Sequence, residues 1–184
     1  LTGPDTPMPL GHELWGMVSE AGANVTHVSV GDRVVVQPMS NGNNIGNGGT
    51  EGGFSPYLLV RNAALDTGST VRLPPALPQA SGALVEPLSV AQHGANRVAA
   101  SAADKAVIFG AGPIGLSMLQ VLNYRGLRNI VVVDLSERRL DAARALGAIA
   151  LRADDPQLSQ TLVEHHGSKN FFGMTMPGST VFFE

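Results

Sequence analysis

The chain has 184 residues, enough for one large domain or two small ones, and 43% of them are hydrophobic, which supplies material for a core. Its net charge of −3 argues against a polyanion-binding or membrane-binding surface, so we expect neither a nucleic-acid nor a membrane partner. Cysteine is absent, which excludes disulfides, a thiolate nucleophile and a cysteine metal site within these residues. No apolar run approaches the roughly 20 residues that span a bilayer, and no basic-then-apolar leader opens the chain, so we expect a cytoplasmic protein.

The first part of the chain has the pattern of short β-strands. Runs of β-branched residues separated by turn residues predict strands at 15–20, 33–37, 57–60 and 70–73. Residues 41–53, between the second and third of these strands, are rich in Asn and Gly. Because such a stretch offers few side chains to a core, we expect a flexible loop that buries nothing.

The second part alternates between helix and strand. An amphipathic helix is predicted at 88–98, and His165 and His166 end a later helix, where positive charge suits the helix dipole. We further predict strands at 105–109, 130–134 and 180–184 and helices at 113–124, 136–145 and 156–166. This alternation implies a parallel sheet, so we expect an α/β, doubly wound second half joined to a mainly-β first half near residue 88.

A glycine turn lies between the first predicted strand and the first predicted helix of this second half. Gly110 permits the tight turn, Gly112 lets the backbone approach a pyrophosphate, and Gly115 allows the helix to pack closely on the strand. Pro113 and Ile114 complete the turn, and the free N–H groups of the helix N-terminus favour phosphate. In this context the pattern indicates a dinucleotide-binding site.

Asp134 ends the next predicted strand, about 20 residues beyond the last glycine, where a carboxylate accepts hydrogen bonds from the adenosine ribose hydroxyls. Leu135 and Ser136 follow it, so no arginine stands ready for a 2′-phosphate, and the residues favour NAD over NADP. Arg139 is a candidate for stacking on adenine, against the alternative of a solvated arginine in the first turn of a helix.

Three residues of the first half are candidate metal ligands. Gly11 is followed by His12 and Glu13 just before a predicted strand, and Glu86 stands at the junction of the two halves. An imidazole and two carboxylates suit a divalent metal, but their spacing alone does not show that they converge. The alternative is a surface histidine beside solvated acids.

Five motifs occur in one order along the chain: GHELWG at 11–16, VGDRV at 30–34, GGFSPY at 52–57, EPLSV at 86–90 and GAGPIGL at 110–116. Together they resemble the medium-chain dehydrogenase/reductase superfamily and its zinc-dependent alcohol dehydrogenases. The EPLSV motif is similar to the branch of sorbitol, butanediol and threonine dehydrogenases.

The resemblance implies a partial GroES-like catalytic domain at 1–88 and a partial NAD-binding Rossmann domain at 89–184. It implies a zinc-dependent oxidoreductase that transfers a hydride between an alcohol or polyol and NAD, in a homo-oligomer, either a dimer or a tetramer. The histidine of the family's zinc site falls on His12. Glu13 and Glu86 match the acids that act as ligands or through water.

The sequence also departs from the family. The cysteine that supplies the first zinc ligand is missing, and only an Asn/Gly loop stands near 39–48, where many members carry a structural zinc lobe. The chain therefore reads as about half of such an enzyme. Two alternatives stay open, a zinc-free quinone or enone reductase of the same superfamily and a non-catalytic dinucleotide-binding paralogue.

Overall fold

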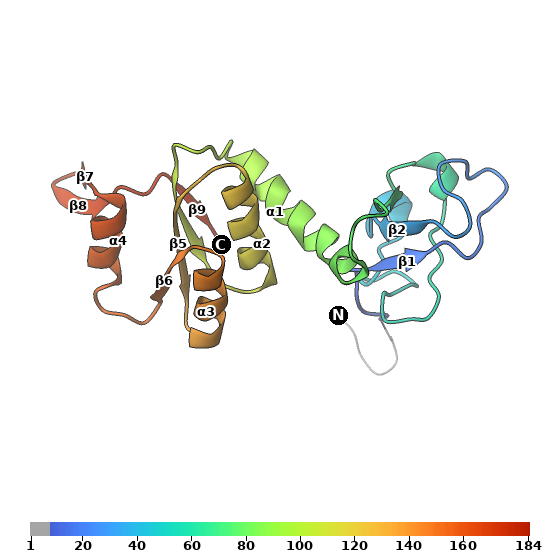
Figure 1. The fold of residues 1–184 in the computed structure, drawn as a ribbon, viewed down its shortest axis with the longest axis horizontal. Helices are drawn as coiled ribbons and strands as arrows, with labels where there is room; N and C mark the ends of the chain where they lie inside the picture. Colours follow the sequence, from blue (N-terminus) through green and yellow to red (C-terminus); the bar gives the residue numbers. More distant parts are fainter. Residues whose placement is uncertain (1–7) are drawn as a thin grey trace. The chain divides into compact units, whose positions relative to one another are not determined.

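A computed structural model of the protein describes residues 8–184. The chain divides into two compact units, Leu1–Glu86 and Pro87–Glu184 (Figure 1). Within the described range, none of the helices combines the length and the apolar character needed to cross a membrane.

The first unit contains a three-stranded antiparallel sheet in the order β1-β2-β3. The strands are β1 (Trp15–Met17), β2 (Arg33–Val36) and β3 (Thr70–Arg72), joined by 3-10 helices η1 (Ser40–Gly42) and η2 (Ala63–Leu65) and followed by η3 (Gln79–Leu84). Three of the four predicted strands are therefore present, each shorter than expected. The prediction of a strand at 57–60 is wrong, because the Leu59 N–H is directed to the Glu51 carboxylate at 3.4 Å and not to a neighbouring strand.

The Asn/Gly-rich segment 41–53 is packed, contrary to the expectation that it buries nothing. Ile45 is completely buried, and Asn43 is buried beside it. The Asn43 amide donates to the carbonyls of Ser40 and Arg61 at 2.7 and 3.0 Å, and its oxygen accepts from the Arg61 N–H at 2.8 Å. Tertiary contacts that local composition does not reveal therefore fix this segment.

The second unit contains a four-stranded sheet in the order β6-β5-β4-β9, and every neighbouring pair is parallel. The strands are β4 (Lys105–Phe109), β5 (Asn129–Asp134), β6 (Ile149–Arg152) and β9 (Val181–Phe183). Counted along this sheet the order is 3-2-1-4, which is the 3-2-1 order of one mononucleotide-binding half of a doubly wound fold followed by one further strand. The chain reverses direction across the sheet between β4 and β9, so the carboxyl end of β4 is a topological switch point, where ligands bind in such sheets.

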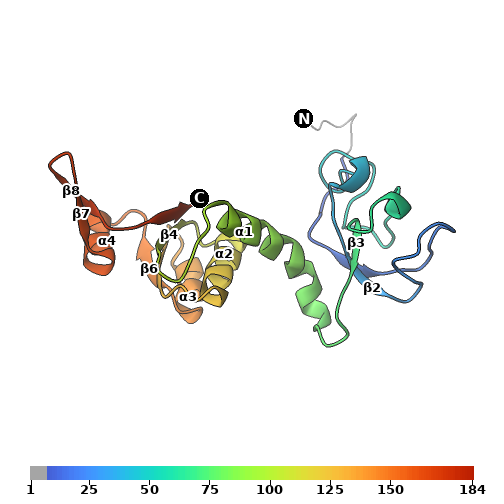
Figure 2. The ribbon, with the colours of Figure 1, turned by 90° about the horizontal axis from the view of Figure 1, so that it is seen from above.

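Helices cover both faces of this sheet. The helices are α1 (Val85–Arg97), α2 (Pro113–Tyr124), α3 (Glu137–Ala145) and α4 (Leu158–His166). Buried residues of α1, α2 and α3 pack with Ala106 and Ile108 on one face, whereas Leu158 and Leu162 of α4 pack with Val107 on the other. Figures 1 and 2 both show α4 on the side of the sheet opposite α2. The alternation along β4 follows from the period of two in a strand, which sends successive side chains to opposite faces.

A hairpin of β7 (Ser168–Phe171) and β8 (Met174–Pro177) lies between α4 and β9 and was not predicted. Figure 1 shows it beyond α4, away from the sheet.

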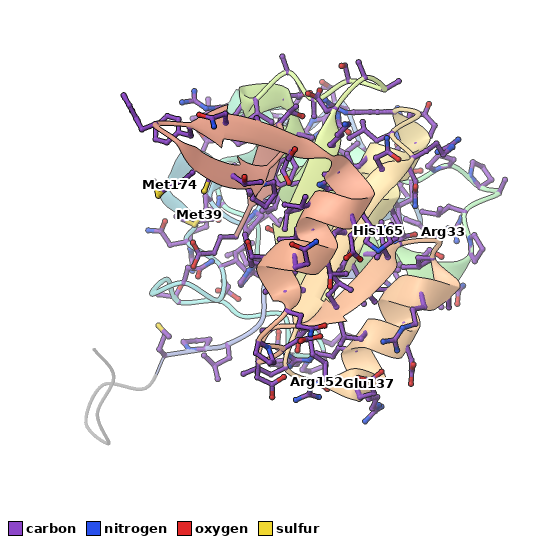
Figure 3. All side chains as sticks on the ribbon, turned by 90° about the vertical axis from the view of Figure 1, so that its left-hand side faces the viewer. Arg33, Met39, Glu137, Arg152, His165 and Met174 are labelled. Carbon is purple, nitrogen blue, oxygen red and sulfur yellow. The ribbon has the colours of Figure 1, made fainter. Side chains whose placement is uncertain are left out.

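A charged surface cluster joins α3 and β6, where Glu137 pairs with Arg144 at 2.6 Å and lies 4.0 Å from Arg152 (Figure 3). Exposed ion pairs of this kind contribute little to stability.

Candidate functional site

The structure brings His12, Glu13 and Glu86 together. Each offers one ligand atom, and these atoms all lie within 4.8 Å of one another. His12 and Glu86 are half-buried and Glu13 is exposed, so the group faces solvent on one side. All three belong to the first unit. The sequence spacing could not show this convergence.

Glycines place the segments that carry these ligands. Gly11 has a φ of +88°, a conformation that glycine adopts without strain, and it precedes His12 directly. Gly82, in η3 just before Glu86, packs its bare Cα against the Trp15 side chain, where an added Cβ would lie 2.5 Å from Cγ. Trp15 begins β1, directly after the His12 segment, so this contact holds the two ligand-bearing segments beside each other. Gly82 could not be singled out from the sequence, because no local pattern links it to Trp15.

The donor set fits a divalent metal. One imidazole nitrogen and two carboxylate oxygens are ligands that zinc accepts, and three protein ligands leave a fourth position open, as in catalytic sites. The carboxylates would balance the charge of the ion.

An open pocket of about 680 Å³ lies in the second unit at the carboxyl ends of its strands. Its lining residues are Phe109, Gly110, Val133, Asp134, Leu135, Ser136, Arg139 and Ala153. Gly110, Asp134 and Arg139 were singled out from the sequence, whereas Gly112, Pro113, Ile114 and Gly115 stand beside this pocket in the chain without lining it. The pocket occupies the place where the topology of an open parallel sheet predicts a ligand.

The turn between β4 and α2 has the geometry that its glycines predict. Gly110 has a φ of +97°, and its N–H donates to the Val133 carbonyl at 2.7 Å. An added Cβ at Gly115 would lie 1.9 Å from the Gly110 carbonyl oxygen, so α2 can approach β4 only with glycine there. An added Cβ at Gly112 would meet nothing within 4 Å, which leaves space beside the backbone.

Backbone amides hold the Asp134 carboxylate. The Ser136 N–H donates to Oδ1 and the Ala111 N–H to Oδ2, each at 2.7 Å. These two bonds, first that of Ser136, hold the pKa of Asp134 below its ordinary value, and Arg139 at 3.8 Å acts in the same direction. The carboxylate is therefore ionised and oriented, and each oxygen keeps acceptor capacity for a ligand hydroxyl. The Ala111 and Ser136 amides are contributions that the sequence analysis did not name.

Comparison with known proteins shows similarity to dehydrogenases in both units of the chain. Residues 1–69 match the model of the alcohol dehydrogenase GroES-like domain. The (R,R)-butanediol dehydrogenase of Bacillus subtilis (strain 168) is 38% identical over 89% of this chain and 49% of its own length. The sorbitol dehydrogenase of Homo sapiens is 34% identical over 82% of this chain and 46% of its own. The chain is therefore similar to butanediol and sorbitol dehydrogenases over most of its own length.

Solved structures of dehydrogenases have a similar fold. The crystal structure of 2R,3R-butanediol dehydrogenase from Bacillus subtilis superposes with a TM-score of 0.73 at 36% identity, covering 86% of this chain and 48% of that one. A short chain alcohol dehydrogenase from E. coli CFT073, complexed with the cofactor NADH, has a TM-score of 0.75 at 27% identity over 88% of this chain and 52% of its own. The chain thus spans about half the length of the butanediol dehydrogenases that it matches.

Proposed function

We propose that the protein is a zinc-dependent oxidoreductase that transfers a hydride between an alcohol or polyol and NAD. The observation that carries the proposal is the convergence of His12, Glu13 and Glu86, with their ligand atoms within 4.8 Å of one another. The names of the butanediol and sorbitol dehydrogenases to which the chain is similar support the substrate class. We assign residues 1–88 to part of a GroES-like catalytic domain and 89–184 to part of an NAD-binding domain.

In this proposal the metal-ligand group works through its charge and geometry. His12 supplies a neutral nitrogen, while Glu86 and Glu13 supply carboxylate oxygens that balance a divalent charge. When bound, zinc acts as a Lewis acid that makes an alcohol hydroxyl more acidic near neutral pH. The exposed side of the group, at Glu13, leaves an approach for a small substrate.

The second unit provides the nucleotide site in this proposal. Asp134, held by two backbone amides, is oriented to accept hydrogen bonds from ribose hydroxyls, and its negative charge opposes a 2′-phosphate. The space beside Gly112 and the N-terminus of α2, which begins with Pro113 and Ile114, suit a pyrophosphate. Bound at these residues, NAD would supply the hydride acceptor. Arg139 lines the same pocket, which supports it as our candidate for stacking on adenine.

The test combines zinc content with activity. The purified protein should contain zinc by mass spectrometry and should reduce NAD⁺ with 2,3-butanediol or sorbitol. His12→Ala should lose the zinc and at least about 10²-fold in kcat/KM, while NADH affinity stays within about twofold. Glu20→Gln, an exposed acid of the same unit, is the matched control and should behave as the unaltered protein.

A zinc-free reductase of the same superfamily is the competing function. It predicts NAD(P)H-dependent reduction of quinones or enones that persists in His12→Ala. Activity of that kind without bound zinc would overturn the proposal.

We also propose a homo-oligomer, either a dimer or a tetramer, which sedimentation of the purified protein tests.

A further inference from the structure

The glycine-rich segment 41–53, which we call the glycine loop, lies directly against the two residues that precede His12. The Gly53 N–H donates to the Gly11 carbonyl at 2.7 Å, and the Phe54 N–H donates to the Leu10 carbonyl at 3.3 Å. Backbone hydrogen bonds therefore join the glycine loop to the segment that carries His12.

These contacts require glycine in the loop. An added Cβ at Gly46 would lie 2.4 Å from the Gly11 carbonyl oxygen, and one at Gly52 would lie 2.5 Å from that of Leu10. Both distances are far shorter than a carbon and an oxygen can approach without bonding, and backbone atoms cannot rotate away as a side chain can. Any larger residue at Gly46 or Gly52 would push on the peptide that presents His12.

The loop is itself anchored within the first unit. Ile45, directly before Gly46, is completely buried, and its N–H donates to the Pro38 carbonyl at 2.9 Å. The Gly46 N–H in turn donates to the Glu51 carbonyl at 2.8 Å, which closes the loop on itself. The buried Ile45 side chain and the hydrogen bond from Gly46 to Glu51 therefore fix the part of the loop that contacts Leu10 and Gly11.

We infer that the glycine loop sets the position of His12, with Gly46 and Gly52 as positioning residues. The loop fixes the peptide at Leu10 and Gly11, and this peptide determines where the His12 imidazole lies relative to Glu13 and Glu86. A metal-ligand group held in place before the ion arrives binds it more tightly than one that must be ordered. The inference rests on the proposed metal site and assigns the loop a role in ligation that the sequence pattern, read as a flexible loop, does not suggest.

Two alanine variants of the loop separate positioning from backbone strain. Gly46 and Gly48 both have positive φ, +66° and +95°, so alanine is strained at either position. An added Cβ at Gly48 meets nothing within 4 Å, whereas the one at Gly46 meets the Gly11 carbonyl. Both variants therefore place alanine at a positive φ, but only Gly46→Ala adds a clash with the Gly11 carbonyl.

The experiment titrates the metal-free protein with Co²⁺ and records its visible absorption. Gly46→Ala should bind Co²⁺ at least about tenfold more weakly, or about 1.4 kcal/mol, with shifted absorption bands. Gly48→Ala should match the unaltered protein in both respects. Equal affinities and equal spectra for the two variants would overturn the inference.

A second readout needs no metal. In the metal-free protein, NMR should show a changed His12 imidazole resonance and a faster-exchanging Gly53 amide in Gly46→Ala but not in Gly48→Ala. Identical His12 resonances in both variants would refute the role of the loop. If the unaltered protein binds no Co²⁺, the proposed function fails, and the NMR comparison still decides whether the loop positions His12.

Discussion

His166 is the most deeply buried titratable side chain in the described part of the second unit, with 1% exposure. Its Nδ1 is hydrogen-bonded with the Ser179 hydroxyl at 2.8 Å, and its carbonyl accepts from the Lys105 ammonium at 2.7 Å. Burial lowers the pKa of His166, and the positive charges of Lys105 and His165 lower it further. His165 and His166 do end α4 as predicted, but the folded environment favours the neutral ring of His166.

The stability of the protein should consequently depend on the protonation of His166. Because its pKa is lower in the folded state than the ordinary value of about 6.5, the unfolded chain binds the proton more readily as the pH falls. The stabilisation is fully present above pH 6.5 and is lost as the pH falls below it. His166→Asn keeps a partner for Ser179 and cannot titrate, so it should flatten the change in unfolding free energy between pH 7.5 and 5.5.

Urea unfolding at the two pH values measures this change. His93→Asn, at an exposed histidine of α1, should keep the full pH dependence of the unaltered protein. At pH 7.5 the His166→Asn variant should lose about 1–2 kcal/mol through poorer packing. A slope as steep in His166→Asn as in the unaltered protein would show that another group causes the effect.

At Asp134 the expected effect is on nucleotide choice. Asp134→Asn removes the charge and places an amide N–H against one of the two backbone donors, Ala111 or Ser136. We expect NADH affinity to fall about tenfold and discrimination against NADPH to weaken. Titration of both nucleotides by fluorescence measures this, with Asp141→Asn, an exposed acid of α3, as the control. Unchanged preference in Asp134→Asn would mean that the ribose lies elsewhere.

Among the elements, the turn between β4 and α2 offers two glycines with different tasks. Gly115→Ala would bring a Cβ to 1.9 Å from the Gly110 carbonyl oxygen, so α2 must move off the sheet. It should lower the unfolding free energy by about 1–3 kcal/mol and weaken NADH binding. Gly112→Ala meets no atom within 4 Å, so it should leave stability within about 0.5 kcal/mol while still weakening NADH.

Thermal unfolding and NADH titration of both variants test this division of roles. Equal losses of stability in the two variants would contradict the assignment of Gly115 to packing. Full NADH affinity in Gly112→Ala would contradict the approach of a pyrophosphate at that residue.

The predicted strands at 105–109 and 130–134 and the predicted helices at 113–124 and 136–145 are present because each carries a complete local signal, whereas β6 was not predicted. The strand β5 is a continuous apolar run ended by Asp134, and α2 opens with Pro113 after a glycine turn, as helices often do. The β7–β8 hairpin escaped prediction because its apolar residues, such as Phe171 and Met174, are exposed and serve no core. Hydrophobic periodicity in the sequence predicts a helix or strand only where the apolar residues of that element are buried in a core.

Prediction of the first unit was weaker, since long-range contacts decide its structure. Ile45 becomes a core residue through tertiary packing, and Gly82 meets Trp15 from far along the chain. The meeting of His12 with Glu86 was expected only from family resemblance, because their separation in sequence carries no signal of proximity. The three candidate ligands could be chosen by residue type, but their proximity is a result of the fold.

For the molecule as a whole, the two units differ in how much core they contain. Among residues 8–86 the buried apolar side chains are Val28, Val34, Val36 and Ile45. The second unit, by contrast, has apolar clusters on both faces of its sheet. A small core gains proportionally more from a bound metal, because binding to the folded state alone stabilises that state.

Metal removal should therefore lower the thermal stability of the first unit more than that of the second. Addition of Zn²⁺ at 100 times its dissociation constant should stabilise by about 2.7 kcal/mol, and Glu86→Gln should lose most of this gain. Hydrogen exchange resolved along the chain measures the effect in each unit. Equal protection by zinc in both units, or in Glu86→Gln, would show that the stabilisation does not come from this group.

X-ray absorption of the zinc-loaded protein tests the ligand set most directly. We expect nitrogen or oxygen neighbours at about 2.0–2.1 Å with the scattering signature of one imidazole, and the loss of that signature in His12→Ala. An imidazole signature that survives in His12→Ala, or zinc without any imidazole neighbour in the unaltered protein, would contradict the assignment of His12, Glu13 and Glu86 as the metal site.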